Sequence, residues 1–385
     1  MDFRLTPQDE AFREELSRFL DRELTPDIRQ EFEERGLPGR RYYRFMQKVG
    51  EKGWLGLTWP REYGGLAGPP IHKFLLVEEL AKRGVEYRHV AESIVGPTLI
   101  LYGTPQQKAE LLPRIARGEM VCCLLYSEPH AGSDLASLEL QARREGDSYV
   151  IQGQKLFSSE ADLADHAWVA ARTNPAVPKH RGISVFLVDM KTPGITVRPL
   201  ISLAGDRRFN EVFLDGVRVP LDARVGEEDR GWYYVAAALD IERATAGAGG
   251  FVGQAWALLQ DLAGLAREKG VAPCLRREVA QRYEELEVLR VLTYRLLWLM
   301  GQGKAPSYES SELKLFGSEL TQRLAQTAMK FLGLSGALQG EGAPLQGRLA
   351  RFYLRAISDT IRGGTSEVQR NIIALRGLGL PSGGG

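Results

Sequence analysis

Cysteine is scarce in this sequence, which has three in 385 residues: Cys122, Cys123 and Cys274. An odd number without a regular spacing builds no disulfide framework and favours a reducing compartment with buried thiols. Cys122 and Cys123 stand together in an apolar run, and in a strand they would face opposite sides of the sheet. Neither a Cys-x-x-Cys pair nor a local cluster of histidine and cysteine occurs, so we expect no metal site.

Long apolar runs are missing as well. The longest stretches, such as 121–126, are far too short to cross a bilayer. The N-terminal segment 1–12 contains acidic residues and lacks the contiguous apolar core of a signal peptide. From these absences we expect a cytoplasmic protein with no membrane partner.

The sequence also lacks an excess of either positive or negative charge. The 50 Lys and Arg residues are balanced by 49 Asp and Glu residues, which gives a net charge of +1. No block of Lys or Arg stands apart from neighbouring acids, so there is little electrostatic basis for binding nucleic acid. With 44% hydrophobic and 26% charged residues, the composition is that of an ordinary globular protein, long enough for two or three domains.

The familiar motifs of nucleotide and hydrolase chemistry are absent too, since no Walker loop, Gly-x-Ser-x-Gly elbow or His-Glu-x-x-His occurs. One glycine-rich run, 247–253, superficially resembles a dinucleotide fingerprint. Val252 stands where the third glycine should be, and no strand precedes the run, so the fingerprint fails. We interpret the run as small residues that allow two helices to pack closely.

What the sequence does contain is a clear change of apolar period along the chain. In the first third, Thr6-Pro7 and Thr104-Pro105 each supply an N-cap hydroxyl followed by a proline at the first helical position. From about Val121, short runs rich in β-branched and aromatic residues alternate with Gly, Asp, Asn and Pro, as in an antiparallel β domain. The last of these runs is 209–220.

Beyond Gly231, long helical periods return that resemble the helices of a bundle. They cover 231–268, 276–300, 308–333 and 347–360. The order of helices, strands and helices is not the alternation of a doubly wound sheet. We therefore predict an α+β, mostly α fold with an N-terminal helical domain (1–120), a middle antiparallel β domain (121–228) and a C-terminal four-helix bundle (229–385).

Six segments have sequences that are typical of one protein family. They are GWLGLTWPREYGG (53–65), YGTPQQKAELLPRIARGE (102–119), YSEPHAGSD (126–134), VIQGQKLFSS (150–159), EVFLDGVRVP (211–220) and GGTSEVQRNIIA (363–374). In these segments and their order, the chain resembles the acyl-CoA dehydrogenase family through almost its whole length. The resemblance implies the fold predicted above, with an extended FAD bound between the β domain, the bundle and a neighbouring subunit. FAD bound in this way needs no Gly-x-Gly-x-x-Gly motif.

The resemblance also implies which residues contact the flavin. Tyr126 and Ser127 would contact the pyrimidine side of the isoalloxazine ring, and Ser133 would reach both the flavin phosphate and the CoA chain. Phe157 would pack on the ring, and the Ser159 hydroxyl would donate toward N5 and O4, where charge accumulates on reduction. Further cofactor contacts that the resemblance implies are Gly132, Ser158, Lys269, Thr365 and Glu367. Outside these motifs, Phe157 would be interpreted as a strand core residue and the serines as turn residues.

The reaction of the family needs a carboxylate that removes the α-proton of the thioester while the β-hydrogen leaves as hydride to flavin N5. Many members have that base just before Gly-Thr-Ser, where this chain has Gly363. A second branch, resembling isovaleryl-CoA and long-chain enzymes, has it in a Leu-x-x-Glu-Arg context, here Leu239 to Arg243. We therefore predict that Glu242 is the catalytic base and that Gly363 offers its backbone N–H to the thioester oxygen. The alternative is that Glu242 is an ordinary surface residue.

Two neighbours of Glu242, Asp240 and Arg243, resemble the family pair that holds the adenosine-phosphate end of CoA, and a guanidinium suits phosphate geometry. The segment for cross-subunit FAD binding departs from the family pattern, because Lys269 replaces the usual arginine. Lys269, Arg276 or Arg277 could bind the FAD pyrophosphate of the neighbouring subunit, and the sequence does not choose among them.

The resemblance implies an enzyme that converts an acyl-CoA to the trans-2-enoyl-CoA and passes electrons to an electron-transfer flavoprotein. It also implies a homotetramer built as a dimer of dimers. Two alternatives stay open. An acyl-CoA oxidase would use oxygen directly, although such relatives are considerably longer. A non-catalytic subunit of a mixed tetramer would lack a glutamate at both base positions, and Glu242 argues against it. Chain length and branching of the acyl group are not fixed by the sequence.

Overall fold

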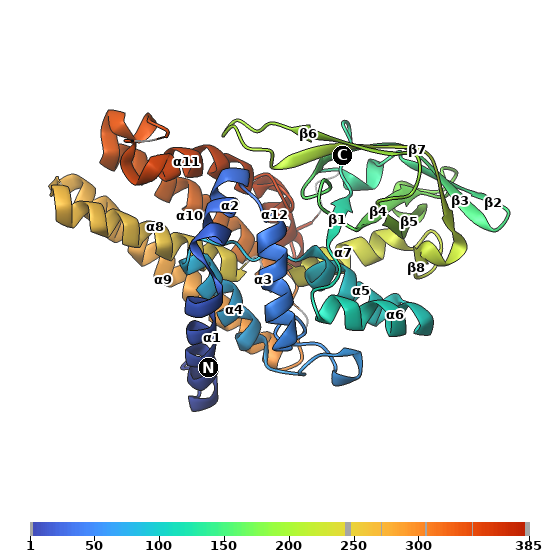
Figure 1. Ribbon diagram of the computed structural model, residues 1–385, viewed down its shortest axis with the longest axis horizontal. Helices are drawn as coiled ribbons and strands as arrows, with labels where there is room; N and C mark the ends of the chain where they lie inside the picture. Colours follow the sequence, from blue (N-terminus) through green and yellow to red (C-terminus); the bar gives the residue numbers. More distant parts are fainter. Residues whose placement is uncertain (1–2, 243–247, 271, 305, 341, 382–385) are drawn as a thin grey trace. The chain divides into compact units, whose positions relative to one another are not determined.

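The computed structural model describes residues 3–242, 248–270, 272–304, 306–340 and 342–381. The chain forms two compact units. The first comprises Met1–Leu24, Pro69–Tyr87 and Glu242–Gly385, and the second comprises Thr25–Gly68 and Arg88–Ile241. Helices precede and follow the strands in the chain (Figure 1), so the predicted fold class is confirmed. The domain boundaries at 120/121 and 228/229 stay a prediction.

Two of the helices before the sheet, α1 (Pro7–Glu23) and α6 (Pro105–Ala116), begin where the sequence predicts. The Thr6 and Thr104 hydroxyls each accept from the backbone N–H three residues further on, and the side chains of Asp9 and Gln107 bond back to the cap. Proline occupies the first helical position, where its missing N–H leaves no bond unmade. The helices are α1 (Pro7–Glu23), α2 (Pro26–Arg35), α3 (Arg40–Glu51), α4 (Pro70–Lys82), α5 (Gly96–Tyr102) and α6 (Pro105–Ala116).

Among the described residues, eight strands of the second unit pair into one sheet, in the order β6-β7-β3-β2-β4-β5-β8 with β1 against β4. The strands are β1 (Cys122–Leu125), β2 (Gln141–Glu145), β3 (Ser148–Ser158), β4 (His166–Arg172), β5 (Ile183–Asp189), β6 (Ile195–Leu200), β7 (Phe209–Pro220) and β8 (Arg224–Val225). Most neighbours are antiparallel, while β4 pairs in parallel with β1 and, at one position, with β2. Two strands go beyond the prediction. The strand β2 buries a single residue and shows no apolar alternation, and β8 follows 209–220.

Both faces of this sheet carry buried apolar residues. Cys122 belongs to one cluster with Trp168, and Cys123 belongs to the other with Val169. The two cysteines therefore face opposite sides of the sheet, as predicted. Burial raises the pKa of both thiols, which keeps them protonated at neutral pH. Cys274 is exposed, so the expectation of buried thiols is wrong for this residue.

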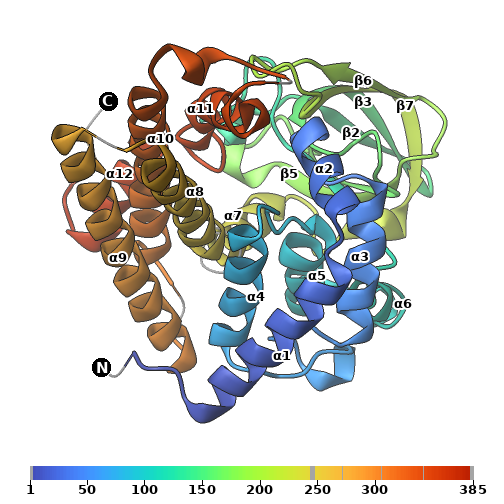
Figure 2. The same cartoon turned by 60° about the vertical axis from the view of Figure 1, so that its left-hand side comes forward.

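Long helices return after the sheet. They are α7 (Gly231–Glu242), α8 (Ala248–Lys269), α9 (Pro273–Gly301), α10 (Glu309–Leu332), α11 (Arg348–Asp359) and α12 (Ser366–Ile372). In the first unit, α8, α9 and α10 pack side by side (Figure 2), as in a helix bundle. The predicted helical stretch 231–268 contains α7 and α8, and residues 243–247 between them lie outside the described part of the chain.

From Ala248 on, the glycine-rich run forms the start of α8, where Gly249 and Gly253 lie against α4 in the first unit. A Cβ atom added at Gly249 would lie 2.9 Å from Val77, and one added at Gly253 would lie 2.4 Å from the Cβ of Ala81. Real side chains do not approach so closely, so the α4–α8 packing requires glycine at both positions. The interpretation of this run as a helix-packing surface is confirmed.

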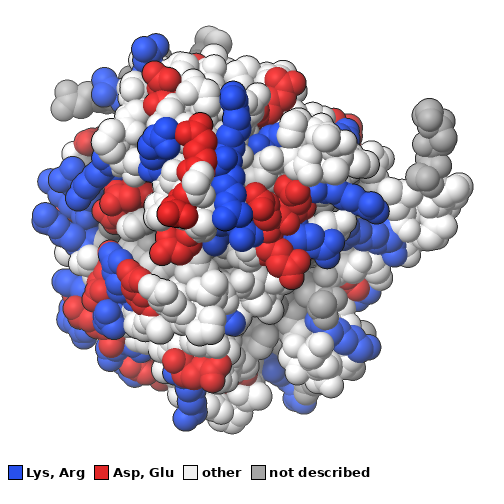
Figure 3. Space-filling view, turned by 90° about the vertical axis from the view of Figure 1, so that its right-hand side faces the viewer, with Lys and Arg blue, Asp and Glu red and all other residues white. Residues whose placement is uncertain are grey.

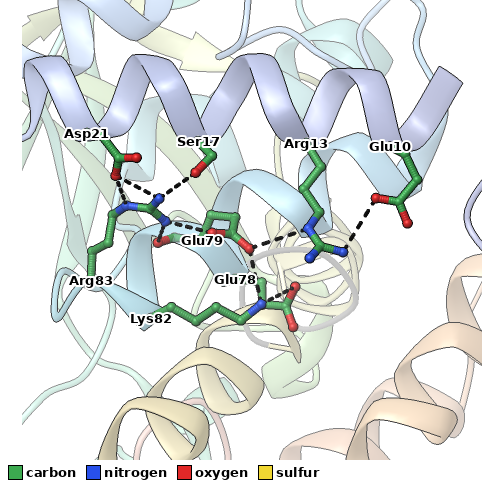
Figure 4. Close-up of polar contacts among 8 residues, drawn as sticks. All are labelled: Glu10, Arg13, Ser17, Asp21, Glu78, Glu79, Lys82 and Arg83. Carbon is green, nitrogen blue, oxygen red and sulfur yellow. Dashed lines mark hydrogen bonds and ion pairs between the residues drawn. The ribbon is translucent and has the colours of Figure 1, made fainter. Parts of the chain in front are cut away.

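An ion-pair network joins α1 to α4 in the same unit (Figure 4). The Arg83 guanidinium donates to Asp21 Oδ1 at 2.9 Å and to Glu79 Oε2 at 2.6 Å. Lys82 Nζ lies 3.2 Å from Glu78 and 3.1 Å from Glu79. Both glutamates are buried, so these bonds compensate charges that would be costly to bury alone.

Replacing Glu79 by glutamine is expected to lower the free energy of unfolding by about 2 kcal/mol at neutral pH, because Arg83 and Lys82 lose a buried carboxylate. Burial raises the pKa of Glu79, but the charge of Lys82 and the hydrogen bonds from both cations outweigh it, so the pKa lies below its ordinary value. Such a carboxylate stabilises the fold above its unfolded pKa of about 4.3, and the contribution is lost as the pH falls through the lower folded value. The urea midpoints of wild type and variant should therefore converge as the solution is acidified.

Glu14 on α1 provides the control for this network. It pairs with Arg18 at 3.8 Å, and the two side chains are 73% and 70% exposed. Glu14→Gln should change stability by less than about 0.5 kcal/mol. If Glu79→Gln is as stable as the wild type at neutral pH, the network is dispensable for stability.

The described residues contain no helix that is both long and apolar enough to span a membrane. Within the same part of the chain, no group of three or more His, Cys, Asp or Glu side chains could hold a metal ion. On the face drawn in Figure 3, Lys and Arg are interspersed with Asp and Glu, in line with the net charge of +1.

Candidate active site

The two segments predicted to face the flavin lie next to each other in the second unit. The loop 126–133 follows β1, and the segment 157–159 starts at the end of β3. Two hydrogen bonds join the loop to the two β3 residues just before this segment, from the Leu156 N–H to the Ser127 carbonyl at 2.8 Å and from Lys155 Nζ to the Tyr126 carbonyl at 2.9 Å. The structure thus brings the start of the loop against the end of the strand. Tyr126 is buried, Ser127 is half-buried, and Gly132 and Ser133 are exposed.

A buried ion pair holds this junction. Lys155 is fully buried, and its Nζ lies 2.8 Å from Glu128 Oε1. The Glu128 carboxylate also accepts from the backbone N–H groups of Glu139 at 2.7 Å and Leu140 at 2.9 Å. Burial lowers the pKa of Lys155 to about 8 in spite of the neighbouring carboxylate. The sequence did not lead us to predict a structural role for either residue. Their position inside two of the family motifs, 126–134 and 150–159, could have indicated one.

Phe157 has the geometry of a binding surface. The residue is 59% exposed, and its φ of +58° lies in the left-handed region that non-glycine residues rarely adopt. The pairing of β3 with β7 shifts in register between Lys155 and Ser158, so a β-bulge turns the side chain out of the regular pleat. The ring packs edge-on against Phe209, with the centroids 5.9 Å apart. The alternative that Phe157 is a strand core residue is therefore wrong.

The two serines that follow differ in their environment. Ser158 is buried, and its carbonyl accepts from Asn210 Nδ2 at 3.0 Å. Its hydroxyl has no hydrogen-bond partner among the described residues, which is uncommon for a buried polar group. Ser159 is half-buried. An exposed aromatic residue, followed in the sequence by one with an unsatisfied hydroxyl, fits a flat heterocycle with an apolar face and a polar edge, so the residues present fit a flavin.

The predicted base is the last residue of α7. Glu242 is half-buried, and Asp240 is half-buried in the same turn. Arg243 lies outside the described residues. The start of the helix is fixed at Gly231, where an added Cβ would lie 2.8 Å from the backbone of Ser184.

The turn Gly363-Gly364-Thr365 lies in the first unit and is held by two polar side chains. Both glycines have left-handed φ values, +66° and +91°. Lys314 Nζ donates to the Gly364 carbonyl at 2.6 Å, and Gln369 Nε2 donates to the carbonyls of Gly363 at 3.1 Å and Gly364 at 3.3 Å. A Cβ added at Gly363 would meet nothing within 4 Å, so open space stands at the commoner base position. The joint action of Glu242 and Gly363 on one substrate stays a prediction.

A pocket of about 460 Å³ lies beside this turn. Two predicted cofactor residues, Thr365 and Glu367, line it together with Arg323 and Arg370. Ser366 is a further wall residue, and its buried hydroxyl lacks a hydrogen-bond partner within the described part of the chain. Arg370 pairs with Glu319, another wall residue, at 2.6 Å, and Arg323 pairs with Glu285 at 3.1 Å, so the wall carries charges of both signs. Ser366 and Arg370 stand inside the family motif 363–374, whereas no local pattern in the sequence marks Arg323 as a wall residue.

The candidates for cross-subunit FAD binding are only partly described. Lys269 is the last residue of α8, and its side chain lies outside the described part of the structure. Arg276 and Arg277 are exposed at the start of α9. The choice among the three stays a prediction.

Along the chain, the strands stand between two helical regions, and one of these strands carries a bulged Phe-Ser-Ser segment that fits a flavin. These features are typical of an oxidoreductase that binds a flavin. The sequence matches the N-terminal domain of acyl-CoA dehydrogenase over residues 6–119, its middle domain over 123–217 and its C-terminal domain over 229–378. The chain belongs to the acyl-CoA dehydrogenase family, which consists of flavoproteins that act on acyl-CoA.

Individual relatives agree with this assignment. The chain is 35% identical to the acyl-CoA dehydrogenase FadE26 of Mycobacterium tuberculosis, with 98% of each chain covered. It is 28% identical to the mitochondrial isovaleryl-CoA dehydrogenase of Pongo abelii, and the alignment covers 96% of this chain and 88% of that protein. Among solved structures, the Tcur3481-Tcur3483 steroid ACAD is 35% identical with a TM-score of 0.92, covering 99% of this chain and 100% of that one. The ChsE4-ChsE5 complex from Mycobacterium tuberculosis is 34% identical with a TM-score of 0.88, at the same coverage.

Proposed function

We propose that this chain catalyses the FAD-dependent α,β-dehydrogenation of an acyl-CoA thioester to the trans-2-enoyl-CoA. The Glu242 carboxylate removes the α-proton, and the backbone N–H of Gly363 donates to the thioester oxygen, where negative charge builds up. FAD, when bound, supplies the acceptor for the hydride that leaves the β-carbon. Asp240 and Arg243 hold the adenosine-phosphate end of CoA.

One observation supports this proposal above the others: the joined segments 126–133 and 157–159. Phe157 offers an exposed ring face, and the buried Ser158 hydroxyl lacks a partner among the described residues. In the proposal the Ser159 hydroxyl would donate toward N5 and O4 of the flavin, and the loop 126–133 would contact the ring. Thr365 and Glu367, which line the pocket of about 460 Å³, contribute to the rest of the cofactor site.

For the electron acceptor we propose an electron-transfer flavoprotein. A relative that is 29% identical over 95% of this chain and 97% of its own is a subunit of the caffeyl-CoA reductase-Etf complex of Acetobacterium woodii. We also propose a homotetramer built as a dimer of dimers. The names of two similar structures, Tcur3481-Tcur3483 and ChsE4-ChsE5, each join two different chains, so a mixed tetramer is the second candidate. Native mass spectrometry of the purified chain with FAD tests the first candidate: a tetramer of this chain alone supports the homotetramer, and a smaller species supports the mixed tetramer.

The experiment that tests the reaction is anaerobic mixing of the FAD-loaded protein with a panel of acyl-CoA thioesters, straight, branched and ring-bearing. At least one member should bleach the flavin absorbance and yield its 2-enoyl-CoA in equal amount. If none does so, the dehydrogenase proposal fails. Rapid reoxidation by air with release of hydrogen peroxide would instead identify an oxidase.

A further inference from the structure

A glutamate in an unusual conformation directly follows the two serines of the flavin-facing segment. Glu160 has a φ of +64°, and its side chain is fully buried. In this left-handed region the Cβ atom crowds the backbone, so Gly, Asn and Asp are the usual occupants. A buried glutamate persists there only where its surroundings over-determine the conformation, and such outliers gather at functional sites.

The Glu160 carboxylate has two donors in the second unit. Arg88 Nε lies 2.8 Å from Oε1, and the Tyr43 hydroxyl donates to Oε2. Burial, followed by the charge of Glu160, raises the pKa of Tyr43 well above its ordinary value, so the hydroxyl keeps its proton and donates. Hydrogen bonds to an ionised group are about twice as strong as neutral ones. They tie the turn after β3 to α3 and to the segment between α4 and α5.

This clamp acts on a very short stretch of chain. Phe157 and Glu160, with left-handed φ values of +58° and +64°, enclose Ser158 and Ser159. Ser158 is held separately, by the bond from Asn210 to its carbonyl at 3.0 Å. Ser159 is bonded to Ser158 on one side and to Glu160 on the other, so the position of its hydroxyl depends on both anchors.

We propose that Glu160, held by Arg88 and Tyr43, is a positioning residue that fixes the Ser159 hydroxyl. The inference rests on the proposed function, in which that hydroxyl donates toward flavin N5 and O4. Glu160 itself touches neither flavin nor substrate, and it acts through the backbone turn from which Ser159 projects. A displacement of about 1 Å at a reacting centre costs on the order of 100-fold in rate, so the clamp affects the rate of flavin reduction more than substrate affinity.

The test uses Glu160→Gln as folded, FAD-loaded protein. Glutamine keeps the shape of the side chain but removes the charge that Arg88 and Tyr43 bind. At saturating acyl-CoA we expect anaerobic flavin bleaching to slow by roughly tenfold to 100-fold, with KM changed by less than about threefold. The absorbance spectrum of the bound FAD should also shift. A purely structural role would lower the unfolding temperature and move neither the spectrum nor the rate.

Arg35→Gln is the matched control, because Arg35 forms another ion pair to the same turn, with Asp162 at 2.7 Å, and the two side chains are 32% and 36% exposed. This variant should bleach at the wild-type rate. Tyr43→Phe removes one donor from Glu160 and keeps the ion pair, so it should slow bleaching by about two- to fivefold. If Glu160→Gln does not fold, the bleaching rate of Tyr43→Phe tests the positioning role in its place.

Two results would overturn the positioning role. One is wild-type spectra and bleaching rates in the folded variants of Glu160 and Tyr43. The other is an equal loss of rate in Arg35→Gln, which would mean that any disturbance of the turn has the same effect. A wild-type protein that no acyl-CoA bleaches would instead contradict the proposed function, so the two failures are distinguishable.

Discussion

Replacing Glu242 by glutamine is expected to slow anaerobic flavin bleaching by about 10²- to 10⁴-fold, because the α-proton then has no positioned base. Glutamine has nearly the same shape and still forms hydrogen bonds, so the acyl-CoA should bind with similar affinity. Stopped-flow absorbance at saturating acyl-CoA gives the rate of reduction, and equilibrium titration of the variant gives the affinity separately. Equal rates for variant and wild type would refute the base assignment.

Asp240 provides the control for this variant. It is also half-buried in the last turn of α7, so Asp240→Asn removes the same charge from the same part of the helix. In our proposal Asp240 binds CoA and transfers no proton. Its variant should therefore raise KM severalfold and keep the saturating rate within about threefold of the wild type. A large loss of rate in Asp240→Asn would attribute the effect to local charge and not to a base.

Gly363 allows an independent check of the relocated base. A Cβ added there meets nothing within 4 Å, although its φ of +66° disfavours a side chain by roughly 1–2 kcal/mol. If positions 242 and 363 converge on one α-carbon, Gly363→Glu combined with Glu242→Gln should recover part of the lost bleaching rate. A folded double variant without recovery would count against the convergence.

The fold was predictable where its signals are local. Thr6 and Thr104 begin α1 and α6 because a hydroxyl, a proline and a reciprocal side chain all stand within four residues of each other. The strand β2 could not be predicted, because a strand that buries one of five residues shows no alternation. Its place follows from antiparallel pairing with β3, which is a property of the folded sheet.

The candidate site was predictable as segments and not as contacts. Motif order identifies the stretches that contain Phe157 and Glu128, but the bonds that join them are long-range. Lys155 and Glu128 are 27 positions apart, and Arg88 and Glu160 are 72 positions apart. No spacing marks such pairs. The left-handed φ of Phe157 and Glu160 likewise arises from a β-bulge and a clamp, since neither residue type favours that conformation.

Replacing Lys155 by methionine is expected to destabilise the fold by about 3–5 kcal/mol, the cost of leaving a buried carboxylate without its cation. Glu128 keeps its two backbone donors but loses the Nζ contact at 2.8 Å, and the Tyr126 carbonyl loses its bond at 2.9 Å. Because Nζ joins the loop 126–133 to β3, we also expect weaker retention of FAD. The urea midpoint and the FAD content after gel filtration measure the two effects.

A double variant separates the buried charge from the loop contact. Lys155→Met combined with Glu128→Gln removes both charges, and replacing a buried pair together is often nearly neutral, so most of the lost stability, about 2–4 kcal/mol, should return. FAD retention should stay low, because the Tyr126 carbonyl still lacks its donor. Full recovery of FAD would show that the Nζ–Tyr126 bond does not position the loop. If Lys155→Met alone is as stable as the wild type, the ion pair is not required.

The pH dependence of the stability difference between wild type and Lys155→Met shows whether the charge of Lys155 causes that difference. Burial lowers the pKa of Lys155 to about 8, below the value of about 10.4 for a lysine in an unfolded chain. Between these values the unfolded state binds a proton that the folded state has released, so wild-type stability should rise with pH through this window. Lys155→Met has no such group, and its deficit relative to the wild type should widen from neutral pH to about pH 10. A constant deficit would mean that the ammonium stays charged in the folded protein and that Glu128 compensates it fully.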